Sequence, residues 1–293
     1  MTAGVPDPAA AVGATPTWRG LLAQAAGRIG LDDARRIVEE ATGRTPTEAL
    51  LALDEPATAL THDQFRKMID RRAAGEPLQY VLGRWGFRRL DLAVDRRVLI
   101  PRPETEWVVE AALAHVPTDR SSVVVDLGTG SGAIALAVAD ERWPRVRVVG
   151  TDTSVDALAM ARANLAGLGR RATGVELHAG DWWAALPGDL RGGIDVVVSN
   201  PPYVAESDPL PAEVAHWEPT GALVAGPSGL EALEVVVGGA PVWLRCGGVL
   251  VCEIGETQGG AVHQLAGAAG LVGVEIRPDP SGRDRILVAR APG

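Results

Sequence analysis

Short apolar runs that alternate with helical patterns constrain the fold of this chain more than any other feature. From Ser122 onward, strand-length segments are rich in valine and isoleucine, and the run Val196–Val198 offers no polar side chain for a solvent-facing side. Such strands are buried on both faces, which is typical of a mostly parallel sheet flanked by helices. The expected strands are Val123–Leu127, Val146–Thr151, Val175–His178, Ile194–Ser199, Val249–Ile254, Val274–Ile276 and Ile286–Ala289.

Helical patterns separate most of these strands. They are expected at Ala133–Asp140, Val155–Leu168, Gly229–Arg245 and Gln258–Ala269. No helix fits between the last two strands, so at least one pair at an edge of the sheet should be antiparallel. The predicted fold class is therefore α/β, with a Rossmann-like sheet.

Residues 17–83 predict a small N-terminal domain of short helices. Apolar residues recur at helical spacing over Trp18–Ile29. Thr45 begins a capping box with proline at the first helical position, and Thr61 is expected to open a later helix in the same way. This segment carries no obvious chemistry of its own, and a role in docking the substrate is expected only once the main domain is assigned to the cofactor.

The segments around this helical domain have their own character. Residues 1–16 have neither a basic start nor an apolar stretch, so they are expected to be a disordered tail rather than a signal peptide. Residues 84–103 alternate as a β-hairpin linker would, up to Ile100, and a helix is expected around Glu104–His115. Residues 104–293 then form the main α/β domain.

Composition excludes several classes of protein. The formal net charge of −9 argues against a surface that grips a nucleic-acid backbone, so no direct nucleic-acid binding is expected. No apolar run approaches the roughly 18–20 residues of a membrane span. Two cysteines and five histidines provide neither a disulfide framework nor metal-ligand spacing. The chain is expected to be cytoplasmic, without metal and without a membrane partner.

Positive charge is concentrated between Arg66 and Arg102. This stretch has ten basic and four acidic residues, a net +6 that leaves −15 for the rest of the chain. It is either a solvated arginine-rich surface or a docking face for an acidic or RNA-associated partner. The second interpretation predicts that charge reversals at Arg88 and Arg89 weaken substrate binding, so that KM rises, and leave SAM binding intact.

A glycine-rich loop at Asp126–Gly132 is the first candidate for chemistry. It lies between the first strand and a helix, where glycines let a ligand approach the backbone and free N–H groups face outward. Gly128, Gly130 and Ala133 fit the pattern of a dinucleotide site. Gly132 gives the spacing that is usual in S-adenosylmethionine (SAM) sites, so both cofactors stay open here.

Acidic residues after the next two strands fit a nucleoside. Asp152 follows the second strand, where a carboxylate can accept hydrogen bonds from both ribose hydroxyls; a helix cap would use the same position. Asp181 and Trp182 follow the third strand, where a carboxylate and an indole can hold an adenine edge and face.

The segment Asn200-Pro-Pro-Tyr203 follows the buried strand Ile194–Ser199. The Asn200 side-chain oxygen and the Pro201 carbonyl can both accept from one planar NH₂ group, while Tyr203 packs on its face. Orienting a delocalised nitrogen and offsetting its growing charge is what N-methylation requires. Asn200, Pro201 and Tyr203 are therefore the candidate catalytic residues, and Pro202 joins them in binding the substrate.

These motifs resemble the peptide chain release factor glutamine N5-methyltransferases, the HemK/PrmC family. The resemblance covers residues 76–109 and 122–290. It depends most on Glu76–Gly83, Val98–Glu106, Asp126–Ala135, Asn200–Tyr203, Glu218-Pro219 and Glu253–Gly255.

The resemblance implies a class I SAM-dependent methyltransferase with a seven-stranded sheet and a small N-terminal helical bundle. SAM would lie across Gly128, Thr129, Gly130, Ser131, Gly132, Asp152, Asp181, Trp182 and Asn200. The substrate would be the glutamine of the Gly-Gly-Gln motif in class I release factors, clamped by the helical domain and the hairpin.

Three alternatives stay open on the sequence. A glutamine methyltransferase of a large-subunit ribosomal protein shares the Asn200–Tyr203 motif, although Ile100–Glu106 fits the release-factor branch better. Amino-methyltransferases of DNA adenine or rRNA guanine also use this loop, and the charge of −15 outside the basic stretch argues against them. A SAM-binding regulator without turnover is the non-enzymatic alternative.

Overall fold

The computed structural model describes residues 15–293, so the predicted tail at residues 1–16 lies almost entirely outside the described residues. The chain divides into two compact units, one ending at Leu82 and the other beginning at Gly83. Within residues 15–293, no helix is both long and apolar enough to cross a membrane.

The first unit is helical, as the periodicity predicts. Its core is apolar, and the Trp18 ring meets Phe65 edge-on with 5.7 Å between ring centroids. The capping box at Thr45 is confirmed, but the cap predicted at Thr61 is wrong. The hydroxyl of Thr58 accepts the Thr61 N–H, so the fourth helix begins one turn earlier. The helices are α1 Trp18–Ile29, α2 Leu31–Thr42, α3 Pro46–Leu51, α4 Ala59–Ala73 and α5 Leu78–Leu82.

The second unit opens with a hairpin that is shorter than predicted. Strands β1 Arg84–Phe87 and β2 Leu90–Ala93 pair antiparallel, with Trp85 opposite Leu92. Residues 94–102 are not a strand; they form an irregular segment that ends at α6, Pro103–Leu113. The chain turns at Asp95 instead: its carbonyl accepts the Val98 N–H and its side chain accepts the Arg97 N–H, so these donors are lost to a strand ladder. Pro101 then supplies no N–H at all.

Arg88 at the hairpin turn is bound to its own chain. Its guanidinium lies 2.5 Å from a carboxylate oxygen of Glu141 and 2.9 Å from Glu110, and its backbone N–H donates to Glu106. The side chain is only 16% exposed. The prediction that Arg88 presents charge to a partner therefore needs correcting: its charge is used to hold the hairpin against α6 and against α7, Ala133–Arg142.

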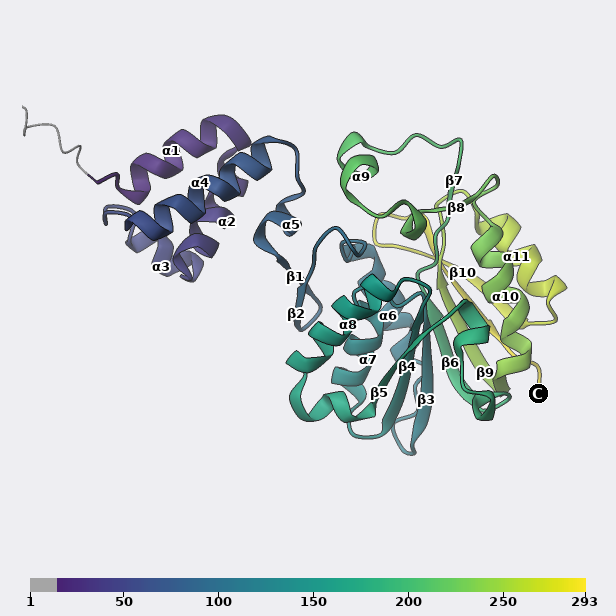
Figure 1. Ribbon diagram of the computed structural model, residues 1–293. Coiled ribbons are helices and arrows are strands. Elements are labelled where there is room, and N and C mark those ends of the chain that lie inside the picture. Colours follow the sequence, from purple (N-terminus) through teal and green to yellow (C-terminus); the bar gives the residue numbers. More distant parts are fainter. Residues whose placement is uncertain (1–14) are drawn as a thin grey trace, which may run out of the picture. The chain divides into compact units, whose positions relative to one another are not determined.

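A seven-stranded sheet organises the rest of the second unit (Figure 1). The strand order is β10-β11-β9-β6-β3-β4-β5; β9, β6, β3, β4 and β5 run parallel, and β11 is antiparallel to both of its neighbours. This confirms the predicted α/β class and the antiparallel edge. The strands are β3 Ser122–Leu127, β4 Val146–Asp152, β5 Val175–Ala179, β6 Ile194–Ser199, β9 Leu244–Glu253, β10 Val272–Pro278 and β11 Asp284–Arg290.

Helices cover both faces of the sheet because successive strand residues point to opposite sides. Val124 and Val198 face the side covered by α6 and by α7, Ala133–Arg142. Val125 and Val197 face the side covered by α10, Glu231–Trp243, and α11, Gly259–Ala268. The two layers are visible in Figure 1. The continuous valine runs are therefore strands with no solvent-facing side.

Two differences from the expected elements lie between β6 and β9, whereas the helix after β4 agrees with the prediction. The helix expected to run to Arg245 ends at Trp243, because Leu244 is extended and pairs with Ile194 in the sheet. Helix α8, Val155–Gly167, follows β4 as predicted. Between β6 and α10 the structure adds β7 Val204–Ala205, α9 Ala212–Trp217 and β8 Val224–Gly226, with β7 and β8 parallel.

Candidate active site

A cavity of about 370 Å³ opens at the carboxyl ends of β3, β4 and β6. From β3 the chain continues to β4 and β5 on one side, and β6 and β9 lie on the other. Such a switch point leaves a crevice where α/β proteins bind ligands. The lining residues are Arg97, Val98, Leu99, Pro101, Arg102, Thr105, Gly128–Ser131, Ala133, Ile134, Thr151–Ser154, Ala157, Gly180, Trp182, Asn200, Pro202, Pro219, Gly221 and Ala222.

The glycine loop turns in the left-handed region, which other residues adopt only with strain. Gly128, Gly130 and Gly132 have φ of 74°, 56° and 86°. A Cβ on Gly128 would lie 3.5 Å from the Trp182 ring, and one on Gly132 would lie 3.0 Å from Leu136. The first two glycines therefore shape the cavity, whereas Gly132 lets α7 pack closely and is not among the lining residues.

Asp126 lies beneath this loop and is fully buried. Its Oδ2 accepts from the Thr129 hydroxyl at 2.7 Å and from the Ala135 N–H at 3.1 Å, and its Oδ1 has no partner within the described residues. Burial raises the pKa of Asp126 to about 7. The residue thus holds the loop against the start of α7.

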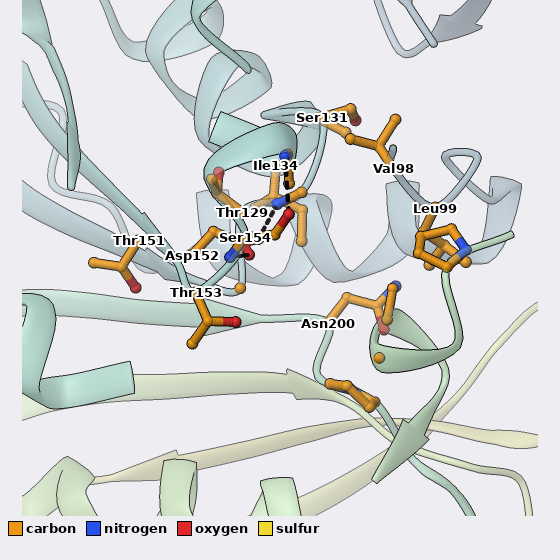
Figure 2. A pocket seen from close by; sticks show the side chains of 18 of the residues that line it. Val98, Leu99, Thr129, Ser131, Ile134, Thr151, Asp152, Thr153, Ser154 and Asn200 are labelled. Carbon is orange, nitrogen blue, oxygen red and sulfur yellow. Dashed lines mark hydrogen bonds between the residues drawn. The ribbon is translucent and has the colours of Figure 1, made fainter. Parts of the chain in front are cut away.

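Asp152, at the end of β4, fixes the other side of the loop (Figure 2). Its two oxygens accept from the Gly130 N–H at 2.9 Å and from the Ser154 N–H at 2.8 Å. Burial raises its pKa. The helix cap itself is Ser154, which accepts from the Ala157 N–H. Asp152 therefore presents a half-buried carboxylate at the cavity wall.

The two tryptophans after Asp181 have different surroundings. Trp182 lines the cavity, and its φ of 40° is uncommon for a bulky residue. Trp183 stacks on Trp243 with 6.1 Å between centroids and donates to the Val235 carbonyl at 2.9 Å. Only the first indole is available to a ligand in the cavity. Asp181 is not among the lining residues.

The Asn200–Tyr203 segment lies beyond β6, where the Ser199 hydroxyl donates to the Leu127 carbonyl at 2.6 Å and joins the ends of β6 and β3. Asn200 and Pro202 line the cavity; Pro201 and Tyr203 are not among its lining residues. Asn200 Nδ2 donates to the Thr105 hydroxyl at 3.1 Å. The Tyr203 hydroxyl donates to Glu253, and burial raises the pKa of Tyr203. Figure 2 shows Asn200 across the cavity from Thr151–Ser154.

The irregular segment Arg97–Arg102 forms another wall of the cavity, although none of its residues was predicted to belong to the site. Buried Glu218 holds it: its carboxylate accepts from the Ile100 N–H at 3.2 Å and lies 2.5 Å from the Arg102 guanidinium. Glu218 and Arg102 are 116 positions apart in the sequence. Pro101 within this segment and Pro103 directly after it are the local sequence features that indicate that the chain leaves the hairpin here.

The cavity fits a nucleoside-bearing cofactor. Its volume lies within the range of small-molecule sites. The loop glycines bring the backbone to the surface without side chains in the way, the Asp152 carboxylate lies beside them, and the Trp182 ring packs against Gly128.

Comparison with known proteins follows the same division of the chain. A family model described as the PrmC N-terminal domain matches residues 17–83, and one described as a methyltransferase small domain matches residues 109–216. A release factor glutamine methyltransferase of Xylella fastidiosa is 42% identical over 279 residues, covering 95% of this chain and 99% of the relative. The chain belongs to the release factor glutamine methyltransferase family.

A second family member supports this assignment. The release factor glutamine methyltransferase of Moorella thermoacetica is 46% identical, covering 84% of this chain and 86% of the relative. A solved methyltransferase from Pyrococcus furiosus is 17% identical, with a TM-score of 0.50, and covers 80% of this chain and all of the other, which shows the shared fold alone. Membership in a methyltransferase family makes the chain an enzyme and favours the methyl-donor interpretation of the glycine loop over the dinucleotide one.

Proposed function

We propose that this chain transfers a methyl group from SAM to the side-chain amide nitrogen (N5) of the glutamine in the Gly-Gly-Gln motif of class I release factors. The observation that carries the proposal is the position of Asn200 in the cavity wall, across from the strand end that carries Asp152. A side-chain amide beside a nucleoside-type site suits methylation of a conjugated nitrogen. The family relatives are named for this activity.

SAM would be held by the loop and the ends of the neighbouring strands. Gly128–Ser131 line the cavity, the Asp152 carboxylate would accept from the ribose hydroxyls, and Trp182 would cover the adenine. Asp181 would accept from the adenine edge, and Gly132 would turn the loop into α7. When bound, SAM supplies a methyl carbon on a positively charged sulfur, which an aligned nitrogen can attack.

The Asn200–Tyr203 segment would bind the glutamine amide. Asn200 Oδ1 and the Pro201 carbonyl would accept its two hydrogens, which aligns the nitrogen and offsets the charge that grows on it. Pro202 and Tyr203 would shield the amide from water. No strong base is needed, because an N-methylated amide is acidic while it is cationic and its proton can leave to water afterwards.

The partner and location follow from the substrate. A class I release factor works in translation, so the enzyme would act in the cytoplasm on a protein. The net charge of −9 gives it no general affinity for nucleic acid. The helical unit and the hairpin would bind the factor, with Arg88 serving the fold rather than the partner.

The decisive test is methyl transfer from labelled SAM to a purified class I release factor, beside a copy with the Gly-Gly-Gln glutamine changed to alanine. Label on the unmodified factor alone is the expected result. Label on both copies would show another target residue. Label on neither, with SAM binding confirmed by calorimetry, would reject the proposed substrate; the glutamine-bearing ribosomal protein and then nucleic acid would be tested next.

A further inference from the structure

A chain of hydrogen bonds runs behind the cavity and joins side chains from separate elements. Asn200 Nδ2 donates to Thr105 Oγ1 at 3.1 Å, and the Thr105 hydroxyl donates to Glu253 Oε2 at 2.6 Å. The Tyr203 hydroxyl donates to the other oxygen of Glu253 at 3.1 Å. Thr105 lies on α6 and Glu253 ends β9; both are buried.

The direction of each bond in this chain follows from its neighbours. When the Glu253 carboxyl is ionised it can only accept, so it takes the hydroxyl hydrogens of both Thr105 and Tyr203. The single hydrogen of the Thr105 hydroxyl is thereby used, and the oxygen can only accept from Asn200. Asn200 must therefore turn its NH₂ group toward Thr105, which leaves Oδ1 without a hydrogen bond within the described residues.

We propose that Thr105 and Glu253 are positioning residues, which fix the side-chain amide of Asn200 with its oxygen turned away from Thr105 as an acceptor for the substrate amide. The reverse orientation would present NH₂ to the substrate's own NH₂, so no hydrogen bond could form. The use of the oxygen rests on the proposed function; the orientation itself does not.

The charge of Glu253 is what sets the direction of the chain. Burial raises its pKa, and Glu104 adds to this, while the two hydroxyl donors and Arg285 on β11 favour the charged form. Once protonated, the carboxyl can donate to Thr105, whose own hydrogen is then free to donate to Asn200 Oδ1. The rate should therefore fall as the pH falls through the raised pKa of Glu253.

Kinetics of three variants give the first test. Thr105→Val keeps the shape and removes the hydroxyl, so kcat should fall about 10- to 100-fold with the Kd for SAM unchanged. Thr105→Ser should restore most of the rate. Ser122→Ala removes another buried hydroxyl, at the opposite end of β3, and should leave kcat unchanged. Equal rates for Thr105→Val and wild type, or failure of the serine variant to recover activity in a folded protein, would overturn the proposal.

The second test needs no activity. The chain has only two asparagines, Asn164 and Asn200, so side-chain ¹⁵N-asparagine labelling gives two NH₂ pairs in the NMR spectrum. Asn164 donates to the Ala93 and Ser131 carbonyls and is an internal control. Thr105→Val should speed solvent exchange of the Asn200 pair at least tenfold and leave that of Asn164 unchanged. Unchanged exchange at Asn200 would overturn the proposal.

Glu253→Gln separates charge from shape. A neutral amide cannot force both hydroxyls to donate, so the rate of this variant should no longer fall at low pH; the acidic limb of its pH–rate profile should be lost. The NMR signals of its Asn200 NH₂ group should also no longer shift with pH. A persistent limb in the folded variant would overturn the role of Glu253. If the wild-type chain methylated no release factor, the proposed function would fail while the NMR result would still decide the orientation.

Discussion

Asp126 is a carboxylic acid whose pKa is changed strongly by its burial. Its pKa is raised from near 4 to about 7 by complete burial. The folded chain therefore binds this proton more tightly than the unfolded chain does. The contribution of the neutral Asp126 carboxyl to the free energy of unfolding is complete below about pH 4 and is lost as the pH rises through 7. Asp126→Asn keeps the shape without the charge. Between pH 5 and pH 8, the free energy of unfolding should fall by about 2 kcal/mol less in the variant than in the wild type.

The measurement is urea unfolding at both pH values, followed by tryptophan fluorescence. Because other carboxylates titrate in both proteins, only the difference between wild type and variant reports on Asp126. Parallel pH dependences would show that Asp126 ionises in the folded state as readily as in water.

Asn200 is the residue whose chemistry defines the proposed site. Asn200→Ala removes an acceptor that acts mainly in the transition state, so kcat should fall about 10²- to 10³-fold. The Kd for SAM should rise much less, as measured by calorimetry. Equal losses in rate and in SAM affinity would make Asn200 a structural residue at the end of β6.

At the scale of elements, the cavity wall Arg97–Arg102 depends on one carboxylate. Glu218→Ala removes the acceptor for the Ile100 N–H and the partner of Arg102. The wall should loosen, which is expected to weaken SAM binding at least tenfold and to speed proteolysis within residues 94–102. Glu218→Gln keeps an acceptor for Ile100 and should show a smaller effect. Normal SAM affinity in the alanine variant would mean that the wall is held by other contacts.

The hairpin has a comparable attachment through Arg88. Arg88→Ala leaves the Glu141 carboxylate, which is 9% exposed, without its closest partner. The free energy of unfolding should fall by about 2–3 kcal/mol. Arg283→Ala is the matched control, since its ion pair with Glu256 is solvent-exposed and contributes little. The free energy of unfolding of both variants is measured by denaturant titration. Equal decreases in the two variants would show that Arg88 does not stabilise the hairpin.

At the scale of the whole molecule, the two units have separate apolar cores. The proposed SAM site lies wholly in the second unit, so binding should stabilise that unit alone. At about 100 times its Kd, SAM should add about 2.7 kcal/mol and raise the melting temperature of that transition by about 5–10 °C. Scanning calorimetry should show the transition of the helical unit unmoved. A single transition shifted as one would mean that the units unfold together.

The sequence by itself determined whatever depends on neighbouring residues. Buried valine runs predicted the parallel sheet, and Thr45 predicted its own capping box. The loop glycines lie at the left-handed positions that their type favours, and Asn200 follows a buried strand as its surroundings indicated. The cap and the loop depend on hydrogen bonds or dihedral angles within a few residues, and burial of a strand on both faces follows from its own apolar run; which strands pair does not, since Val124 pairs with Val196.

Only the tertiary structure decided what meets across the sheet. Strand order brings Thr105 to Glu253 across 148 positions and to Asn200 across 95, and it brings Glu218 to the cavity wall. It also buried Arg88, and it left only Trp182 of the two adjacent tryptophans facing the cavity. No local pattern encodes these contacts, because they depend on which strands pair and on which side chains the packing then removes from water.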